Sequence, residues 1–177
     1  AYAAQTEPQN LAFARAVSYF RLTDRIDFLA SALANLGHAR SLEGDLRGAR
    51  EALDEGLTYQ RQIDDPTWST GTLLWRGRVA RAEGNQQMAV QVLTEGLMAA
   101  QAVHFESAAL EAVAELAGVA LDLGQVLRAV RSLGAVAARQ DATNAFPDIM
   151  TDAAVRQTMA EAQEQLTRES FTTALHE

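Results

Sequence analysis

Histidines are the first residues of this sequence that could do metal or acid–base chemistry. The three histidines, His38, His104 and His176, lie far apart in the chain, and no HExxH-type spacing places two of them on one helical turn. A metal site needs several converging ligands, and a general base needs a group that orients it. We therefore predict no metal site, and we interpret His38 as a partly exposed helix histidine that could at most touch a ligand.

Paired carboxylates are the second candidates for chemistry. Asp64-Asp65 directly precedes Pro66, which is typical of a turn that caps the next helix. Glu111 and Glu115 lie one helical turn apart and could hold a cation or a basic peptide, although a solvated helix face is the simpler interpretation. The sequence contains no Gly-rich phosphate loop, no nucleophile elbow and no cysteine. It therefore predicts neither a catalytic residue nor a cofactor site, and hence no enzyme.

Charge and hydropathy exclude two further classes of partner. The net charge is −8, from 15 basic and 23 acidic residues, and every basic residue is an arginine. These arginines are scattered, whereas nucleic-acid binding uses clustered positive charge. No apolar run approaches the ~20 residues that span a bilayer, and the first residues do not resemble a secretion signal. We expect a cytoplasmic protein that binds neither nucleic acid nor membrane, and, since the sequence does not begin with Met, a piece of a longer chain.

An internal repeat identifies the elements that must carry any function. Gly44, Gly84 and Gly124 follow one another at an interval of 40 residues, and no insertion is needed to keep the register. The same interval relates several further columns: Ala49, Ala89 and Ala129; Leu53, Leu93 and Leu133; Gly37, Gly77 and Ala117; Glu55-Gly56-Leu57 and Glu95-Gly96-Leu97. Five columns in one register are a poor fit to chance.

Each unit predicts two antiparallel helices joined at its glycine. Apolar residues recur at helical spacing on both sides of the glycine, and the small residues sit where the two helices must touch. We predict an all-α fold, an α-solenoid of helix hairpins forming one domain over residues 1–177. Its expected parts are the second helix of a truncated repeat at 8–22, repeats at 25–64, 65–104 and 105–142, a linker at 141–150 and a capping helix at 151–175.

The pattern resembles the tetratricopeptide repeat (TPR) family. Its columns are Leu33, Leu36, Gly37, Ala49, Leu53 and Gly56. The family repeat usually has 34 residues, so the 40-residue period is similar to the longer-helix variant of kinesin light chains and bacterial signalling regulators. The resemblance implies a right-handed superhelix. The segments 49–53 and 131–135 also resemble the C-terminal helical arrays of bacterial regulators that carry a signalling ATPase and often a LuxR-type DNA-binding domain.

The same resemblance implies a binding face. In TPR arrays the first helix of each repeat lines the concave side, which here corresponds to Asn35, His38, Leu74, Trp75, Arg78, Arg81, Glu111 and Glu115. Asn35 matches the column in which longer-repeat relatives grip a peptide backbone. Arg78 and Arg81 could pair with an acidic group. Trp68 and Trp75 lie seven residues apart, hence on one side of a helix. We expect Trp68 in packing and Trp75 at the groove or its edge, where simple packing is slightly favoured over a role as a binding anchor.

Two functions follow as hypotheses. The first is a non-catalytic protein-interaction or scaffold module from a larger regulatory protein, with a protein or peptide partner that could be another domain of the same chain. The helix at 8–22 lacks its own first helix, so a homodimer through this open N-terminal end is a further expectation. The alternative is a small-molecule effector-sensing domain of a bacterial transcriptional or signalling regulator, which would use Trp75, Arg78 and Arg81.

Overall fold

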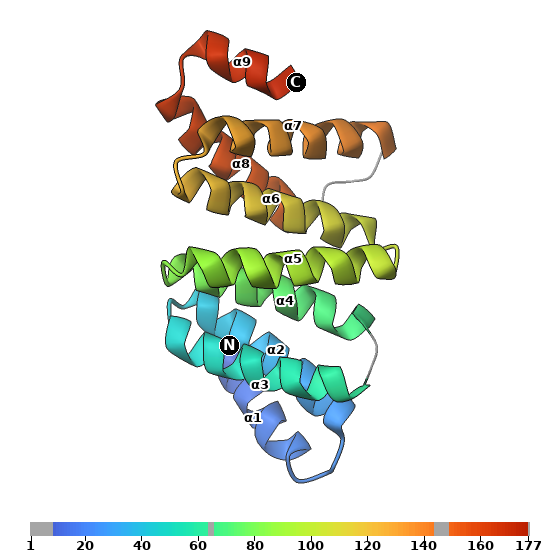
Figure 1. The fold of residues 1–177 in the computed structure, drawn as a ribbon. Helices are drawn as coiled ribbons and strands as arrows, with labels where there is room; N and C mark the ends of the chain where they lie inside the picture. Colours follow the sequence, from blue (N-terminus) through green and yellow to red (C-terminus); the bar gives the residue numbers. More distant parts are fainter. Residues whose placement is uncertain (1–8, 64–65, 144–148, 177) are drawn as a thin grey trace, which may run out of the picture.

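A computed structural model describes residues 9–63, 66–143 and 149–176, and within these ranges the secondary structure is helical (Figure 1). Asp64, Asp65 and residues 144–148, where we expected a capping residue and part of a linker, lie outside the described residues. The helices are α1 (Gln9–Phe20), α2 (Ile26–Leu42), α3 (Leu46–Ile63), α4 (Pro66–Ala82), α5 (Gln86–Ala102), α6 (Glu106–Asp122), α7 (Val126–Thr143), α8 (Ile149–Gln165) and α9 (Arg168–His176). The predicted all-α array of sequential helix pairs is confirmed.

The helices form two layers, with α1 and α9 at opposite ends of the stack (Figure 1). The first helices of the pairs, α2, α4 and α6, contact one another in turn, and α8 continues this layer against α6. In the described part of the chain, the backbones of α3, α5 and α7 make no such close approach to one another. The layer of first helices is therefore the tighter and concave one, and it presents the candidate groove.

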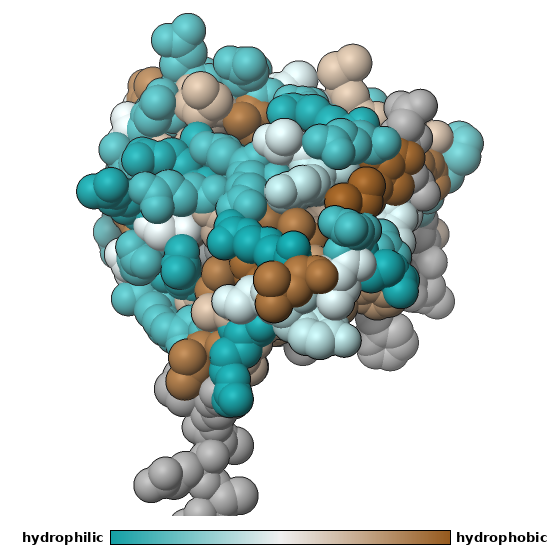
Figure 2. Space-filling view, turned by 90° about the horizontal axis from the view of Figure 1, so that it is seen from below, coloured by the Kyte–Doolittle hydropathy of each residue, from teal (hydrophilic) through white to brown (hydrophobic). Residues whose placement is uncertain are grey.

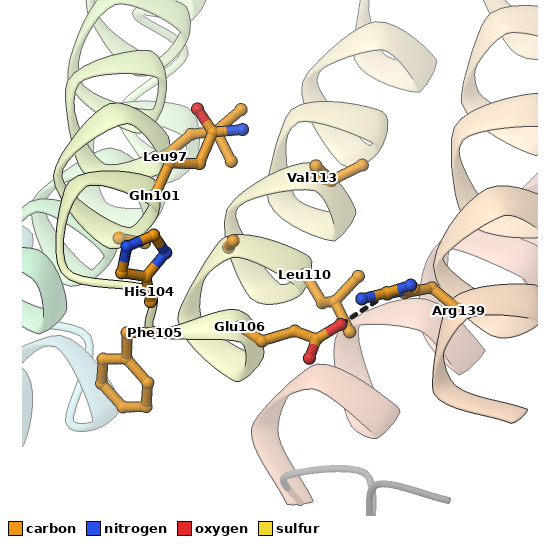
Figure 3. Close-up of a pocket in the computed structure, with 10 residues that line it drawn as sticks. Leu97, Gln101, His104, Phe105, Glu106, Leu110, Val113 and Arg139 are labelled. Carbon is orange, nitrogen blue, oxygen red and sulfur yellow. Dashed lines mark hydrogen bonds and ion pairs between the residues drawn. The ribbon is translucent and has the colours of Figure 1, made fainter. Parts of the chain in front are cut away.

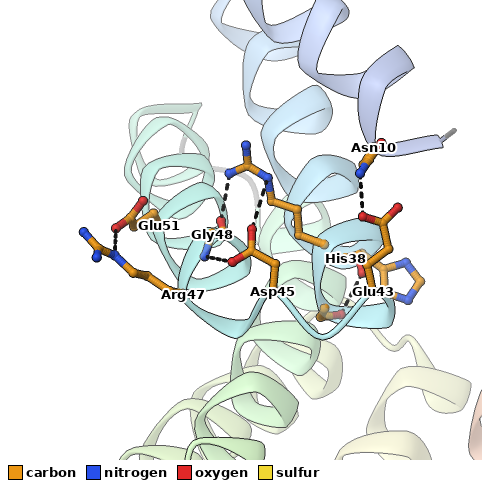
Figure 4. Close-up of polar contacts among 9 residues, drawn as sticks. Asn10, His38, Glu43, Asp45, Arg47, Gly48 and Glu51 are labelled. Carbon is orange, nitrogen blue, oxygen red and sulfur yellow. Dashed lines mark hydrogen bonds and ion pairs between the residues drawn. The ribbon is translucent and has the colours of Figure 1, made fainter.

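The turn within each pair is a left-handed glycine after the first helix. Gly44, Gly84 and Gly124 have φ angles of 83°, 76° and 73°, a region that residues with a Cβ seldom adopt. The amide N–H one residue beyond each glycine reaches back to a carbonyl of the last helical turn, as in Asp45 to Arg40 at 3.0 Å. The Asp45 carboxylate then accepts from the Gly48 amide at 2.9 Å and caps the next helix (Figure 4).

Small residues allow the two helices of a pair to pack closely. A Cβ built on Gly37 would lie 2.5 Å from Leu53 Cγ, and one on Gly77 would overlap the equivalent carbon of Leu93 in the same way. Both leucines are fully buried. The columns of glycine and leucine that define the 40-residue register are therefore the two sides of one recurring contact.

The C-terminal cap differs from the expectation of a single helix over 151–175, which is wrong. The chain breaks after Gln165, and a new helix starts at Arg168. The Thr167 hydroxyl accepts from the Ser170 amide at 3.3 Å, which is N-cap geometry and explains the new start. The break lets α9 fold back on α7, where a Cβ on Gly134 would lie 2.5 Å from the Leu175 carbonyl oxygen. Phe171 and Ala174 are buried by this packing.

Candidate binding surface

A groove of about 420 Å³ crosses the layer of first helices between α2 and α4. Its lining combines aromatic rings with short polar and small side chains, and it carries no charged residue. The lining residues are Ser31, Ala34, Asn35, Gln60, Thr67, Trp68, Gly71, Thr72, Trp75 and Phe105. The surface over Gly71 is open, because a Cβ placed on this glycine would meet nothing within 4 Å.

Trp75 joins the groove to the core. Its ring stacks on His38, with the ring centroids 4.4 Å apart and the planes 4° from parallel. His38 Nε2 is buried and has no hydrogen-bond partner. Burial lowers the pKa of His38, and the nearby positive charge of Arg78 lowers it further. A neutral imidazole packed behind Trp75 therefore fixes the ring, and the structure gives His38 no base or metal partner among the described residues.

Asn35 lines the groove together with Trp75. Its side-chain amide donates to the Ser31 carbonyl at 2.8 Å. This is the one hydrogen bond of the Asn35 side chain in the described part of the chain, so its carboxamide oxygen remains available as an acceptor.

The predicted charged residues form an internal cluster rather than an open receptor. Arg78 donates to Glu111 at 2.5 Å and to Glu115 at 2.6 Å, and the side chains of these two glutamates are 12% and 7% exposed. Burial acts to lower the pKa of Arg78, but the carboxylates of Glu115 and Glu111 outweigh it and raise that pKa above its usual value. Arg81 pairs with Asp122 at 2.6 Å, and this hydrogen bond raises the Arg81 pKa. Both arginines are thus neutralised by their own chain.

The cluster and the stacked pair occupy equivalent places in consecutive repeats. Arg78 lies one period after His38, and Glu115 lies one period after Trp75. The same inter-helix contact is therefore aromatic between α2 and α4 and ionic between α4 and α6. This difference confines the aromatic groove to the first of these two junctions.

Leu74 was expected on the groove and does not lie there. It is 1% exposed and belongs to the core. Its Cδ2 lies 3.2 Å from where a Cβ on Gly96 would be, so the side chain fills the space over the glycine of α5. One residue along a helix turns the side chain by roughly 100°, which separates buried Leu74 from groove-lining Trp75.

Trp68, Gln60 and Phe105 are groove residues that the sequence reasoning missed. Trp68 was expected in packing, but it is 46% exposed, and Phe105 at the start of α6 is 48% exposed. The seven-residue spacing of Trp68 and Trp75 was the available signal, because it places both rings on one side of α4. Nothing in the sequence marks Gln60, which reaches the groove from the end of α3.

A second pocket of about 480 Å³ lies between α5, α6 and α7. His104 and Phe105 lie on one side of it and the Glu106–Arg139 pair, at 2.5 Å, on the other (Figure 3). At the two preceding junctions the outer helices are bridged by Arg21–Glu55 and Arg61–Glu95. Gln101 and Ala135 take those places one period later, so the third junction lacks this ion pair and has room for the pocket.

The α1 end of the stack carries exposed apolar side chains. Leu11, Tyr19 and Leu22 are 48%, 63% and 86% exposed. Figure 2 views the molecule from below, toward this end, and shows hydrophobic surface interspersed with hydrophilic surface. The surface is compatible with the homodimer that we expected from the sequence, which stays a prediction.

Neither a metal cluster nor a membrane-spanning helix is found among the described residues. Over these ranges, no three His, Asp or Glu residues come together in a group that could hold a metal ion. Of the helices in these ranges, none has the combined length and apolar character that crossing a bilayer requires.

The fold is similar to that of known helical repeat proteins. No protein-family model and no curated protein sequence matches the chain. The crystal structure of BtubC (BKLC) from P. vanneervenii matches with a TM-score of 0.71 and 16% identity, over 94% of this chain and 69% of that one. The nearly identical TPR-like repeats of a candidate kinesin light chain of Podosopora anserina match at 20% identity with a TM-score of 0.59, over 97% and 94% of the two chains. A singly substituted form of those repeats matches with a TM-score of 0.61 and 20% identity, over 95% of this chain and 90% of that one. The chain therefore has a TPR-like repeat fold.

Proposed function

We propose that the chain is a non-catalytic protein-interaction module that binds an extended peptide segment in the groove between α2 and α4. The segment belongs to another protein or to another domain of the same chain. The observation that carries the proposal is the exposure of Trp68 and Phe105 beside Trp75 in one uncharged groove. Half-exposed aromatic side chains around a concave surface are typical anchors of protein–protein binding. TPR-like folds serve protein–protein interaction as a rule, which agrees with this choice.

The groove has the two features that peptide recognition requires. Its rings offer apolar contact area that is already ordered, because Trp75 is held by His38. Asn35 supplies a side-chain acceptor for a peptide N–H group. The open surface over Gly71 leaves room for a main chain to pass between them.

The alternative, a small-molecule effector-sensing domain of a bacterial transcriptional or signalling regulator, has less support. It would use Trp75, Arg78 and Arg81, and both arginines are paired with carboxylates of α6. An acidic ligand would have to displace Glu111, Glu115 or Asp122 before either arginine could bind it. Neutral peptide contacts over Trp68 need no such displacement.

A selection from a phage-displayed random dodecapeptide library tests the proposal. We expect the chain to enrich specific peptides, and Trp68→Ala to weaken them at least about 30-fold, since loss of an aromatic anchor costs ~2 kcal/mol or more. Met98→Ala is the matched control, because Met98 is 64% exposed on α5 outside the groove. Failure to enrich any peptide, or equal binding by the Trp68 variant, would contradict the proposal.

A further inference from the structure

The groove contains a buried acceptor that lacks a donor. Gln60 is 3% exposed, and its Nε2 donates to Thr72 Oγ1 at 2.9 Å. Its Oε1 is buried and accepts no hydrogen bond. A buried acceptor without a donor is unfavourable, so a ligand group that brings an N–H to this place gains more than it would at a solvated acceptor. Gln60 Oε1 and the Asn35 carboxamide oxygen thus give the groove two side-chain amide acceptors beside its aromatic rings, and its lining includes no basic residue.

The preceding repeat shows what such a ring can bind. The Arg25 guanidinium lies 4.3 Å from the centroid of the Phe28 ring. Trp68 is one period after Phe28, but the residue one period after Arg25 is Asp65. The chain thus replaces the cation of the first repeat by an acidic residue in the second. In the described part of the chain no cation covers Trp68, although indole binds cations better than the phenyl ring does.

We propose, on the premise of the function proposed above, that the bound segment is basic and seats an arginine side chain in this groove. Its guanidinium covers Trp68, and its N–H groups donate to Gln60 Oε1 and to the Asn35 carboxamide oxygen. Arginine fits better than lysine because its planar, weakly hydrated head stacks on a ring while it donates in its own plane. The net charge of −8 favours a basic partner over an acidic one.

The selected dodecapeptides provide the probe. We expect arginine to be enriched over its frequency in the unselected library, and citrulline in place of the anchoring arginine to raise Kd at least about 10-fold, because citrulline keeps the shape and loses the charge. Lysine at the same position is expected to give an intermediate Kd. Raising NaCl from about 0.05 to 0.5 M is expected to weaken the arginine peptide more than the citrulline peptide.

Variants of groove residues distinguish the proposed arginine site from non-specific peptide binding. Trp68→Phe is expected to keep most of the affinity, as Phe28 also holds a guanidinium, whereas Trp68→Ala loses it. Gln60→Met removes the acceptor at similar length. It is expected to weaken the arginine peptide more than the citrulline peptide, because a hydrogen bond from a charged donor is stronger than one from the neutral ureido group of citrulline. Circular dichroism checks that each variant is folded. If Gln60→Met does not fold, Asn35→Leu is used to test the loss of an acceptor instead.

The outcomes distinguish the two proposals. Peptides that depend on Trp68 but show no arginine preference, or that bind equally well with citrulline, would overturn the arginine site and leave the interaction module intact. Enrichment of acidic peptides would also overturn it. No enriched peptide at all would remove the interaction module itself.

Discussion

The buried cluster between α4 and α6 gives the sharpest test of the packing. Arg78→Met removes the cation that pairs with both Glu111 and Glu115, while it retains an unbranched apolar stem. The two carboxylates, whose side chains are 12% and 7% exposed in the parent chain, would then lose the arginine that pairs with both. We expect the variant to lose stability because an uncompensated buried charge is far less favourable than a buried pair.

The magnitude follows from the burial. Breaking a buried ion pair by removing one partner costs ~3–5 kcal/mol, and Arg78 is itself mostly buried, at 20% side-chain exposure. For a chain of 177 residues this corresponds to a fall in Tm of roughly 6–20 °C. Arg61→Met is the matched control, since the Arg61–Glu95 pair is 61% and 48% exposed and such pairs contribute ~0–1 kcal/mol.

Urea unfolding followed by far-ultraviolet circular dichroism measures the effect. The triple variant Arg78→Met, Glu111→Gln, Glu115→Gln removes all three charges together, and we expect it to recover most of the lost stability. A single Arg78→Met variant that unfolds within about 1 kcal/mol of the parent chain would refute the description of this cluster as buried and mutually dependent.

Three further predictions concern single residues. Burial lowers the folded-state pKa of His38, so the stability that its neutral form contributes is fully present above the unfolded pKa of about 6.5 and is lost as the pH falls through the lower folded pKa. Lowering the pH from 7 to 5 should therefore reduce the free energy of unfolding, measured in urea, more for the parent chain than for His38→Phe. Identical pH profiles for the two chains would contradict this. Gly77→Ala should lower the free energy of unfolding by ~1–3 kcal/mol, because its Cβ would overlap buried Leu93 carbons. Gly71→Ala should raise it by up to ~1 kcal/mol, because a Cβ there would meet nothing within 4 Å. Equal effects of the two substitutions on urea unfolding would refute the described packing. His104 has a φ of 55°, so His104→Gly should raise the thermal midpoint by relieving ~1 kcal/mol of backbone strain, and a lower midpoint would argue against the left-handed turn.

The period of the sequence predicted the framework of the fold. Helices α2, α4 and α6 start 40 residues apart, as do α3, α5 and α7, and the turns fall at Gly44, Gly84 and Gly124. The prediction succeeded for a local reason. A left-handed turn favours glycine and a close helix contact requires a small residue, so both features place a small residue at the same position of successive repeats.

The site was harder to predict, because its contacts join different repeats. Arg78 and Glu115 were both assigned to the concave face, but nothing local shows that they neutralise each other across α4 and α6. Leu74 was misplaced because a shift of one residue changes the helix face, and the column pattern does not resolve that rotation. The helix break at Thr167 was missed because a threonine N-cap inside a helix-forming segment gives a weak signal.

A nitrogen–proton NMR titration with a selected dodecapeptide tests the central assignment most directly. The chain has two tryptophans, Trp68 and Trp75, and both line the groove, so their indole N–H signals report on it alone. We expect both indole signals and the Asn35 side-chain amide signal to move with the peptide, while the Met98 amide on α5 stays in place. Unchanged indole signals together with shifts around Met98 would contradict the assignment of the α2–α4 groove as the contact surface.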